Sequence, residues 1–251
     1  MLKKLARYFT VGEWLLWLGS MALIVLAFVL FDRANYLTLA ASLVGATSLI
    51  FSAKGNPLGQ VLMLAFSVLY GIISYTFAYY GEMLTYLGMT APMALFALIA
   101  WLRHPYKGQR AQVAVGKLKR GEWIWMLLAA AAITAAFWFI LDAFNTANLV
   151  PSTISVTTSF LAVYLTFRRS PYFALAYAAN DVVLIVLWVL ATLEDISYIS
   201  VVVCFALFFV NDLYGFWNWN RMRRAQAAPS PAAAPPAAAE PAARDEAGSA
   251  R

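Results

Sequence analysis

Residues 171–191, PYFALAYAANDVVLIVLWVLA, decide the fold class of this protein. The stretch is almost entirely apolar, carries no Lys or Arg, and places Asn180 and Asp181 close to its middle. Because an α-helix rises about 1.5 Å per residue, a helix of this length crosses the ~30 Å hydrocarbon layer of a bilayer. The stretch therefore predicts a transmembrane helix with a polar pair near its centre.

Similar apolar stretches recur along the 251 residues, which are 63% hydrophobic and only 12% charged. Soluble domains carry about 25% charged residues, so the composition predicts an all-α membrane protein. The first stretch is expected to be a retained span, because its apolar core is longer than the ~7–15 residues of a signal peptide. The eight predicted transmembrane helices are residues 12–31, 36–53, 57–80, 82–102, 122–141, 148–167, 171–191 and 196–219.

The cations predict the orientation of these helices. Eight spans place both termini on one side of the membrane, together with the second, fourth and sixth loops. Seventeen of the 18 Lys and Arg fall on that side, and only Arg33 falls on the other. Since cytoplasmic loops are enriched in Lys and Arg, both termini are expected to be cytoplasmic. The cations thus follow topology rather than forming a nucleic-acid-binding face.

The longest connection, RHPYKGQRAQVAVGKLKR at 103–120, divides the chain into two similar halves. GEWLLWL at 12–18 matches GEWIWML at 121–127, and EMLTYL at 82–87 matches EDISYI at 194–199. GNPLGQVLMLAF, which begins at Gly55, likewise matches RSPYFALAYAAN, which begins at Arg169. These matches predict two tandem repeats, at about 12–102 and 121–219. An even number of helices per repeat makes the copies parallel, with a substrate site between them near mid-membrane.

The domain organisation follows from these spans and from the composition of the C-terminus. Residues 1–224 are expected to form one transmembrane transporter domain. Residues 225–251 are rich in Ala and Pro and lack large apolar side chains. Such a segment cannot build a core, so it is predicted to be a disordered cytoplasmic tail.

Two acids lie well inside the predicted spans, Asp181 and Asp212, and no Lys or Arg does. Other acids, Glu82 among them, stand at span edges where water is close. An intramembrane carboxylate is expensive unless it is paired or hydrated, and is a functional candidate by default. The alternative is a structural hydrogen bond between helices.

Each acid is accompanied by amides and aromatic residues at helical spacing. Such a site offers acceptors, amides and aromatic planes but no cation, which favours a cationic or neutral flat heteroaromatic ligand over an anion. Trp217 and Trp219, beside the basic RMRR, are expected to form an aromatic belt at the membrane interface. The candidate substrate-binding residues are Gln60, Tyr70, Tyr177, Asn180, Asp181, Trp188, Asn211, Asp212 and Tyr214.

The sequence contains no motif typical of an enzyme, such as HExxH, a P-loop, GxSxG or CxxC. The lone His104 has no second metal ligand nearby, and the lone Cys204 excludes an intrachain disulfide. We therefore expect no enzymatic activity, no cofactor and no metal. Three hypotheses remain: a facilitative uniporter, a proton-coupled symporter in which Asp181 or Asp212 carries the proton, and a non-transporting assembly or receptor protein.

The segment from Pro171 to NDLYGFWNW at 211–219, together with YGEMLTYLGMTAPM at 80–93, resembles the PnuC family of vitamin transporters. The resemblance covers roughly residues 10–222 and is strongest to the nicotinamide riboside members. It implies a 3+1+3 helix core related to the SWEET sugar transporters, with an extra N-terminal helix. It also implies a homotrimer in the bacterial inner membrane.

The resemblance further implies facilitated diffusion of an unphosphorylated substrate, which a cytoplasmic kinase then traps. Relatives carry thiamine or riboflavin, so the vitamin stays open. Nicotinamide riboside is favoured because it is a pyridinium cation joined to a ribose.

Overall fold

A computed structural model describes residues 8–76, 79–146 and 148–228. The cations expected on the cytoplasmic side at Lys3, Lys4, Arg7, Arg244 and Arg251 lie outside the described residues. The predicted disordered tail also lies outside them from residue 229 onward.

Among the described residues, eight helices are long and apolar enough to cross a membrane, which confirms the all-α fold class and the predicted eight spans. The differences from the predicted boundaries are small, except that α4 ends at Thr76 instead of residue 80 and the last span continues to Ala227 instead of ending at residue 219. The spans are α2 (Val11–Phe31), α3 (Tyr36–Ala53), α4 (Leu58–Thr76), Tyr80–Arg103, α7 (Arg120–Ala143), α8 (Leu149–Phe167), α9 (Tyr172–Thr192) and Ile196–Ala227.

Two of these spans are composite. The last consists of a short 3₁₀ turn, η2 (Ile196–Tyr198), and α10 (Ile199–Ala227). The fourth consists of α5 (Tyr80–Leu84), a π-helical segment η1 (Thr85–Thr90) and α6 (Ala91–Arg103). Pro92 lies in the first turn of α6, where its missing N–H interrupts the α-helical hydrogen-bond pattern. π-Helical turns are uncommon and frequently lie at functional sites.

The connection between the halves folds into a short antiparallel hairpin of β1 (Pro105–Tyr106) and β2 (Gln109–Val113). Its turn residues Lys107 and Gly108 have φ angles of 49° and 75°, as a two-residue type I′ turn requires. The Val113 N–H donates to the Gly55 carbonyl at 2.9 Å, just after α3. The hairpin is therefore docked against one end of the helix bundle.

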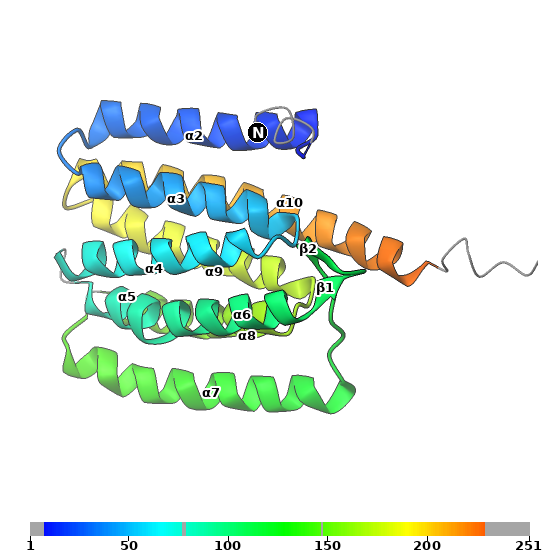
Figure 1. Ribbon diagram of the computed structural model, residues 1–251. Coiled ribbons are helices and arrows are strands. Elements are labelled where there is room, and N and C mark those ends of the chain that lie inside the picture. Colours follow the sequence, from blue (N-terminus) through cyan, green and yellow to red (C-terminus); the bar gives the residue numbers. More distant parts are fainter. Residues whose placement is uncertain (1–7, 77–78, 147, 229–251) are drawn as a thin grey trace, which may run out of the picture.

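The helices of the two halves contact one another in matching order. α3, α4 and α6 pack in sequence in the first half, and α8, α9 and α10 do so in the second. Between the halves, α10 contacts α3 and α6 contacts α8. α2 packs on α3 and α10, α7 packs on α8, and the two lie at opposite edges of the bundle (Figure 1). This order favours the predicted tandem repeat, which stays a prediction.

Two buried tryptophans make equivalent hydrogen bonds across the two contacts between the halves. The Trp219 indole, on α10, donates to the Ser52 carbonyl of α3 at 2.8 Å. The Trp101 indole, on α6, donates to the Thr166 carbonyl of α8 at 2.9 Å. In each case the indole lies on the last helix of one half, α10 or α6. The carbonyl that accepts its hydrogen bond lies in the last turn of α3 or α8 in the other half.

Ion pairs tie both peripheral helices to their neighbours at the same end of the bundle. Lys54, after α3, contacts Glu13 of α2 at 2.8 Å. Arg168, after α8, pairs with Glu122 of α7. Within the described ranges, every Lys and Arg except Arg33 lies at this end, where α10 also ends. We call it the C-terminal end of the bundle.

Candidate substrate-binding site

A small enclosed cavity lies near the middle of the bundle, at the depth of Asp181. It has a volume of about 20 Å³, which leaves room for about one water molecule. Six segments meet there: α3, α4, η1, α8, α9 and α10. Its polar lining consists of Thr90, Ser159, Asn180, Asp181 and Asp212.

Asp181 and Asp212 form the polar centre of the cavity. The side chains lie on the contacting helices α9 and α10, are 4% exposed each, and both line the cavity. The Oδ2 atom of Asp181 has no hydrogen-bond partner within the described chain. With no Lys or Arg among the lining residues, the pair can accept a cation or donors from a ligand.

Asn180 is held in place by two hydroxyl groups of α8. Its Oδ1 atom accepts hydrogen bonds from Thr158 Oγ1 at 2.7 Å and from Ser159 Oγ at 3.0 Å. Because both bonds engage the amide oxygen, the amide NH₂ is the group left to donate to a ligand. These two hydroxyl groups, which were not among the predicted binding residues, position the amide.

Aromatic rings form most of the remaining wall. The lining rings are Phe66, Tyr86, Tyr177, Phe205 and Phe208. The ring centroids of Phe66 and Phe208 are 5.6 Å apart and those of Phe66 and Tyr86 are 5.7 Å apart, both in edge-to-face geometry. The cavity therefore combines aromatic surface with a few polar groups, as small-molecule sites commonly do.

Two of the predicted site residues, Tyr70 and Trp188, lie one layer behind this wall. The Trp188 indole donates to the Tyr70 hydroxyl at 2.7 Å, and both side chains are fully buried. The Tyr70 ring contacts Tyr86, with ring centroids 4.5 Å apart. Tyr70 and Trp188 thus support a lining residue rather than lining the cavity.

Three other predicted residues bond to neighbouring helices away from the cavity. Gln60 donates to Ser52 Oγ at 3.3 Å, and Asn211 donates to Ser20 Oγ of α2 at 3.0 Å. The Tyr214 hydroxyl donates to Glu13 Oε1 at 2.7 Å. Of the predicted set, the structure brings together Tyr177, Asn180, Asp181 and Asp212 at the cavity.

Sequence reasoning missed several contributors. Tyr86 and Thr90 reach the cavity from the π-helical segment, whose altered register cannot be deduced from α-helical spacing. Phe208 lies one turn before Asp212, and this i, i+4 relation was a usable signal.

Two side chains are more deeply buried than expected. Glu82, expected at a wet span edge, is 1% exposed and accepts a hydrogen bond from Ser155 at 3.0 Å. The aromatic-belt prediction is wrong for Trp219, which is completely buried beside Trp101, with ring centroids 5.4 Å apart. Trp217 is 56% exposed, as a belt residue should be.

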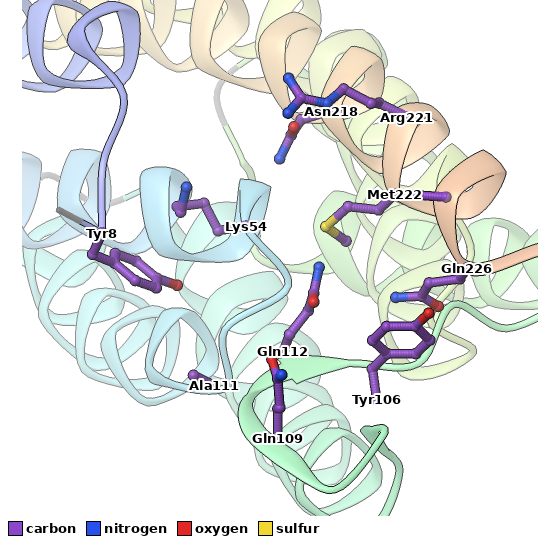
Figure 2. A pocket seen from close by; sticks show the side chains of 11 residues that line it. Tyr8, Lys54, Tyr106, Gln109, Ala111, Gln112, Asn218, Arg221, Met222 and Gln226 are labelled. Atoms are coloured by element: carbon purple, nitrogen blue, oxygen red, sulfur yellow. The ribbon is translucent and has the colours of Figure 1, made fainter. Parts of the chain in front are cut away.

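A second, larger space lies at the C-terminal end of the bundle, between α10, the hairpin and the end of α3. We call it the hairpin cleft; its volume is about 380 Å³. Figure 2 shows Lys54 and Tyr8 on one side, the hairpin residues Gln109 and Gln112 below them, and Arg221 on α10. The cleft thus carries cations, which the central cavity lacks.

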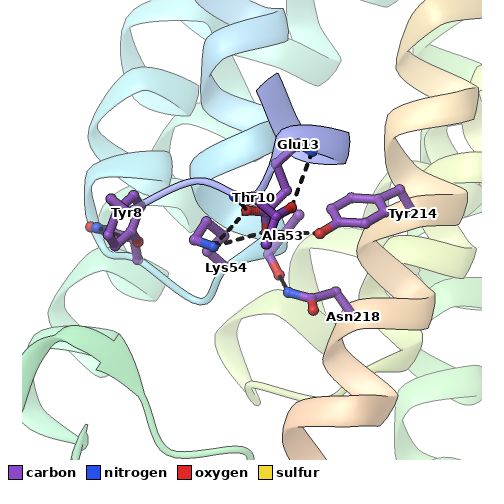
Figure 3. A network of polar contacts seen from close by, with 8 residues as sticks. Tyr8, Thr10, Glu13, Ala53, Lys54, Tyr214 and Asn218 are labelled. Carbon is purple, nitrogen blue, oxygen red and sulfur yellow. Dashed lines mark hydrogen bonds and ion pairs between the residues drawn. The ribbon is translucent and has the colours of Figure 1, made fainter. Parts of the chain in front are cut away.

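A polar network beside this cleft joins α2, α3 and α10 (Figure 3). Glu13 is its centre, because it accepts hydrogen bonds from Lys54 at 2.8 and 2.9 Å and from the Tyr214 hydroxyl. Asn218 of α10 donates to the Ala53 carbonyl of α3 at 2.8 Å. These contacts hold the three helices together at the C-terminal end.

Eight membrane-crossing helices around an enclosed polar cavity define a polytopic membrane transporter. Residues 35–221 match the family described as nicotinamide mononucleotide transporter. This match covers well over half of the chain, so the chain belongs to that family, the PnuC transporters. PnuC proteins are transporters and not enzymes.

Two known proteins illustrate the similarity. The nicotinamide riboside transporter PnuC of Neisseria mucosa is 26% identical over 215 residues, which cover 83% of this chain and 80% of that protein. A crystal structure of the vitamin B3 transporter PnuC superposes with a TM-score of 0.76 at 22% identity. It covers 87% of this chain and 94% of the solved one, and it shows that the two share a fold.

Proposed function

We propose that this protein carries nicotinamide riboside across the membrane by facilitated diffusion. The observation that carries the proposal is the central cavity, where two buried carboxyl groups meet aromatic rings and, among the described lining residues, no Lys or Arg. A pyridinium ring suits both features, because carboxylates and aromatic faces attract cations. Asn180 and the acids offer donors and acceptors for ribose hydroxyls.

The same lining distinguishes the riboside from its phosphorylated form. The family description names the mononucleotide, whereas the Neisseria mucosa relative is named for the riboside. A phosphate group is normally bound by Arg, Lys or backbone N–H groups, and two acids in its place would repel it. The cavity of this chain therefore favours the riboside.

Thiamine and riboflavin are the alternative vitamins. Thiamine also carries a positively charged ring, so the acids alone do not separate it from the riboside. The similarity to a nicotinamide riboside transporter over most of the chain gives the riboside precedence.

Transport requires the helices around the cavity to move apart. A cavity of about 20 Å³ cannot hold a nucleoside, so the described conformation is closed around Asp181. α3 and α10 are held together at one end by Asn218 and Trp219, and these contacts must loosen for the cavity to open there. We infer that the first set of helices (α3, α4 and α6) and the second set (α8, α9 and α10) separate from one another, first at one end of the bundle and then at the other.

The orientation in the membrane, the type of membrane and the oligomeric state are proposed from the charge distribution and the family. The C-terminal end of the bundle, with its Lys and Arg residues, is the cytoplasmic end, and the membrane is the bacterial inner membrane. We further propose that the protein is a homotrimer, and that a cytoplasmic kinase phosphorylates the imported riboside. Phosphorylation would trap it, because the cation-free cavity does not accept the product.

Proton-coupled symport is the second candidate, because Asp181 and Asp212 are buried carboxyl groups at one cavity and such groups can carry a proton across a membrane. Uptake of labelled riboside into vesicles that contain no kinase, with and without a pH gradient, tests both mechanisms. Facilitated diffusion predicts that the internal concentration rises only to the external one in both conditions. Gradient-dependent accumulation above that level would establish symport, and specific binding without flux would indicate a receptor.

A further inference from the structure

The hairpin cleft has the chemistry that the central cavity lacks. Lys54 at the end of α3 and Arg221 on α10 line it together with the rings of Tyr8 and Tyr106 (Figure 2). Its volume of about 380 Å³ lies within the ~300–1,000 Å³ typical of small-molecule sites. Cations, amide donors and flat rings therefore share a space large enough for a ligand.

Of the two cations that line the cleft, Lys54 is paired with an acid, and Arg221 forms no ion pair within the described residues. Lys54 is paired with Glu13, which lies outside the cleft lining, and its Nζ atom is 4.9 Å from the centroid of the Tyr8 ring. The Arg221 guanidinium lies over the Trp217 ring, with its Cζ atom 5.7 Å from the ring centroid. Among the described residues no Asp or Glu lines the cleft, so an anion there meets Arg221 and also Lys54, whose charge is shared with Glu13.

We propose that the hairpin cleft binds a nucleoside monophosphate and that the bound ligand slows transport. A phosphate between Lys54 and Arg221 would form charge-assisted hydrogen bonds with both. The rings of Tyr8 and Tyr106 offer apolar surface to the base, and Gln112 offers an amide to the ribose. The choice of a nucleoside rests on the proposed function, whereas the recognition of phosphate does not.

The effect on transport follows from where the two cations lie. Asn218 and Trp219 of α10 already bond to carbonyls in the last turn of α3, next to Lys54. A phosphate held by Lys54 and Arg221 adds a further link between the same two helix ends. A ligand that binds the closed arrangement better than the open one shifts the protein toward it, so release of riboside at this end becomes slower.

Calorimetric titration of the full-length protein in detergent tests the binding. We expect nicotinamide mononucleotide to bind more tightly than inorganic phosphate, and Arg221→Gln and Lys54→Gln each to weaken it at least tenfold. Arg33→Gln, at the opposite end of the bundle, should leave it unchanged. Binding that is undiminished in Arg221→Gln, or no binding at all, would overturn the proposal, and equal affinity for phosphate would overturn the nucleoside part.

Two further experiments test whether the mononucleotide binds in the cleft rather than in the central cavity, and whether a lipid phosphate occupies the cleft instead. Asp181→Asn should weaken riboside binding and leave mononucleotide binding unchanged; weakening of both would place the mononucleotide in the central cavity and refute the cleft. The binding should persist in nanodiscs of phosphatidylcholine and of phosphatidylglycerol. If phosphatidylglycerol abolishes it, the cleft takes a lipid phosphate and the soluble ligand is excluded.

Transport in liposomes tests the regulation. With mononucleotide on both sides of the membrane, riboside uptake by the wild-type protein should slow several-fold, and uptake by Arg221→Gln should not. Slowing of both proteins equally, or of neither, would contradict the regulatory role. Failure of riboside uptake itself would instead contradict the proposed function, so the two outcomes are distinguishable.

Discussion

Asp181 and Asp212 are placed at the cavity by two different helices, and each was recognisable from the sequence as an acid inside an apolar stretch. Their pairing was not, because it depends on the rotation of α9 against α10. The same limit explains Asn211 and Tyr214, whose side chains point to α2 although they neighbour Asp212 in sequence. The sequence therefore predicts the depth of a polar side chain better than its direction.

Asp181→Asn should weaken riboside binding by about tenfold to a hundredfold. The substitution keeps the shape of the side chain but removes a charge-assisted contact of about 1.5–3 kcal/mol. Asp195→Asn is the matched control, because Asp195 lies in the loop before η2 and bonds to the Ser197 N–H at 2.9 Å. Calorimetry compares the two variants. Equal losses would mean that Asp181 has only a structural role.

The loop acids Asp32 and Asp195 should have opposite effects on the pH dependence of stability. Burial raises the pKa of Asp32 above its ordinary value, so the folded protein binds the proton more tightly than the unfolded chain does. The protein therefore loses stability as the pH rises from the ordinary pKa through the raised pKa of the folded state. Bonds from Ser197 lower the pKa of Asp195, so its contribution is lost as pH falls through the folded-state value.

Thermal unfolding measured from pH 3 to pH 7 compares both Asp→Asn variants with the wild type. Relative to the wild type, Asp32→Asn should gain stability toward pH 7, and Asp195→Asn should lose it. Parallel curves for all three proteins would contradict this assignment.

The elements show which parts of the fold the sequence could predict. Hydrophobic length predicted all eight spans, because the bilayer imposes a minimum length on each. The π-helical segment and the hairpin were not predicted. The first is a change of register inside an apolar run, and the second depends on positive φ at Lys107, a residue that rarely adopts it.

Trp101→Phe and Trp219→Phe should destabilise the protein by similar amounts, about 1–3 kcal/mol each. Each change leaves a buried carbonyl without its indole donor, at Thr166 and Ser52 respectively. Trp217→Phe, at an exposed position, should have little effect. Thermal unfolding measures all three. A large effect at only one of the two buried positions would argue against equivalent roles in the two halves.

Gly45→Ala should impair transport although Gly45 lies on α3 and bears no side chain. A methyl group there would collide with the rings of Phe208 and Phe66, both of which line the cavity. We expect at least a several-fold slower uptake of riboside. Gly19→Ala is the control, since nothing lies within 4 Å of the position its methyl group would take. Equal uptake by both variants would show that the rings adjust freely.

At the scale of the whole molecule, two spaces of opposite character lie along the bundle. The central cavity contains acids and rings, and the hairpin cleft contains cations and rings. The contacts of Asn218 and Trp219 lie at the end of α3, close to the cleft and on the route by which the cavity would open at that end. The protein would then recognise an unphosphorylated cation in the central cavity and a phosphorylated product at the C-terminal end of the bundle, so that a high product concentration slows import.

The most direct test of riboside recognition is a calorimetric titration of the double variant Lys54→Gln, Arg221→Gln, which removes both cations that line the hairpin cleft. Nicotinamide riboside, its mononucleotide, thiamine and riboflavin are titrated in turn, so that binding reports the central cavity alone. We predict that the riboside binds most tightly and that the mononucleotide does not bind detectably. Mononucleotide binding as tight as that of the riboside would contradict the account.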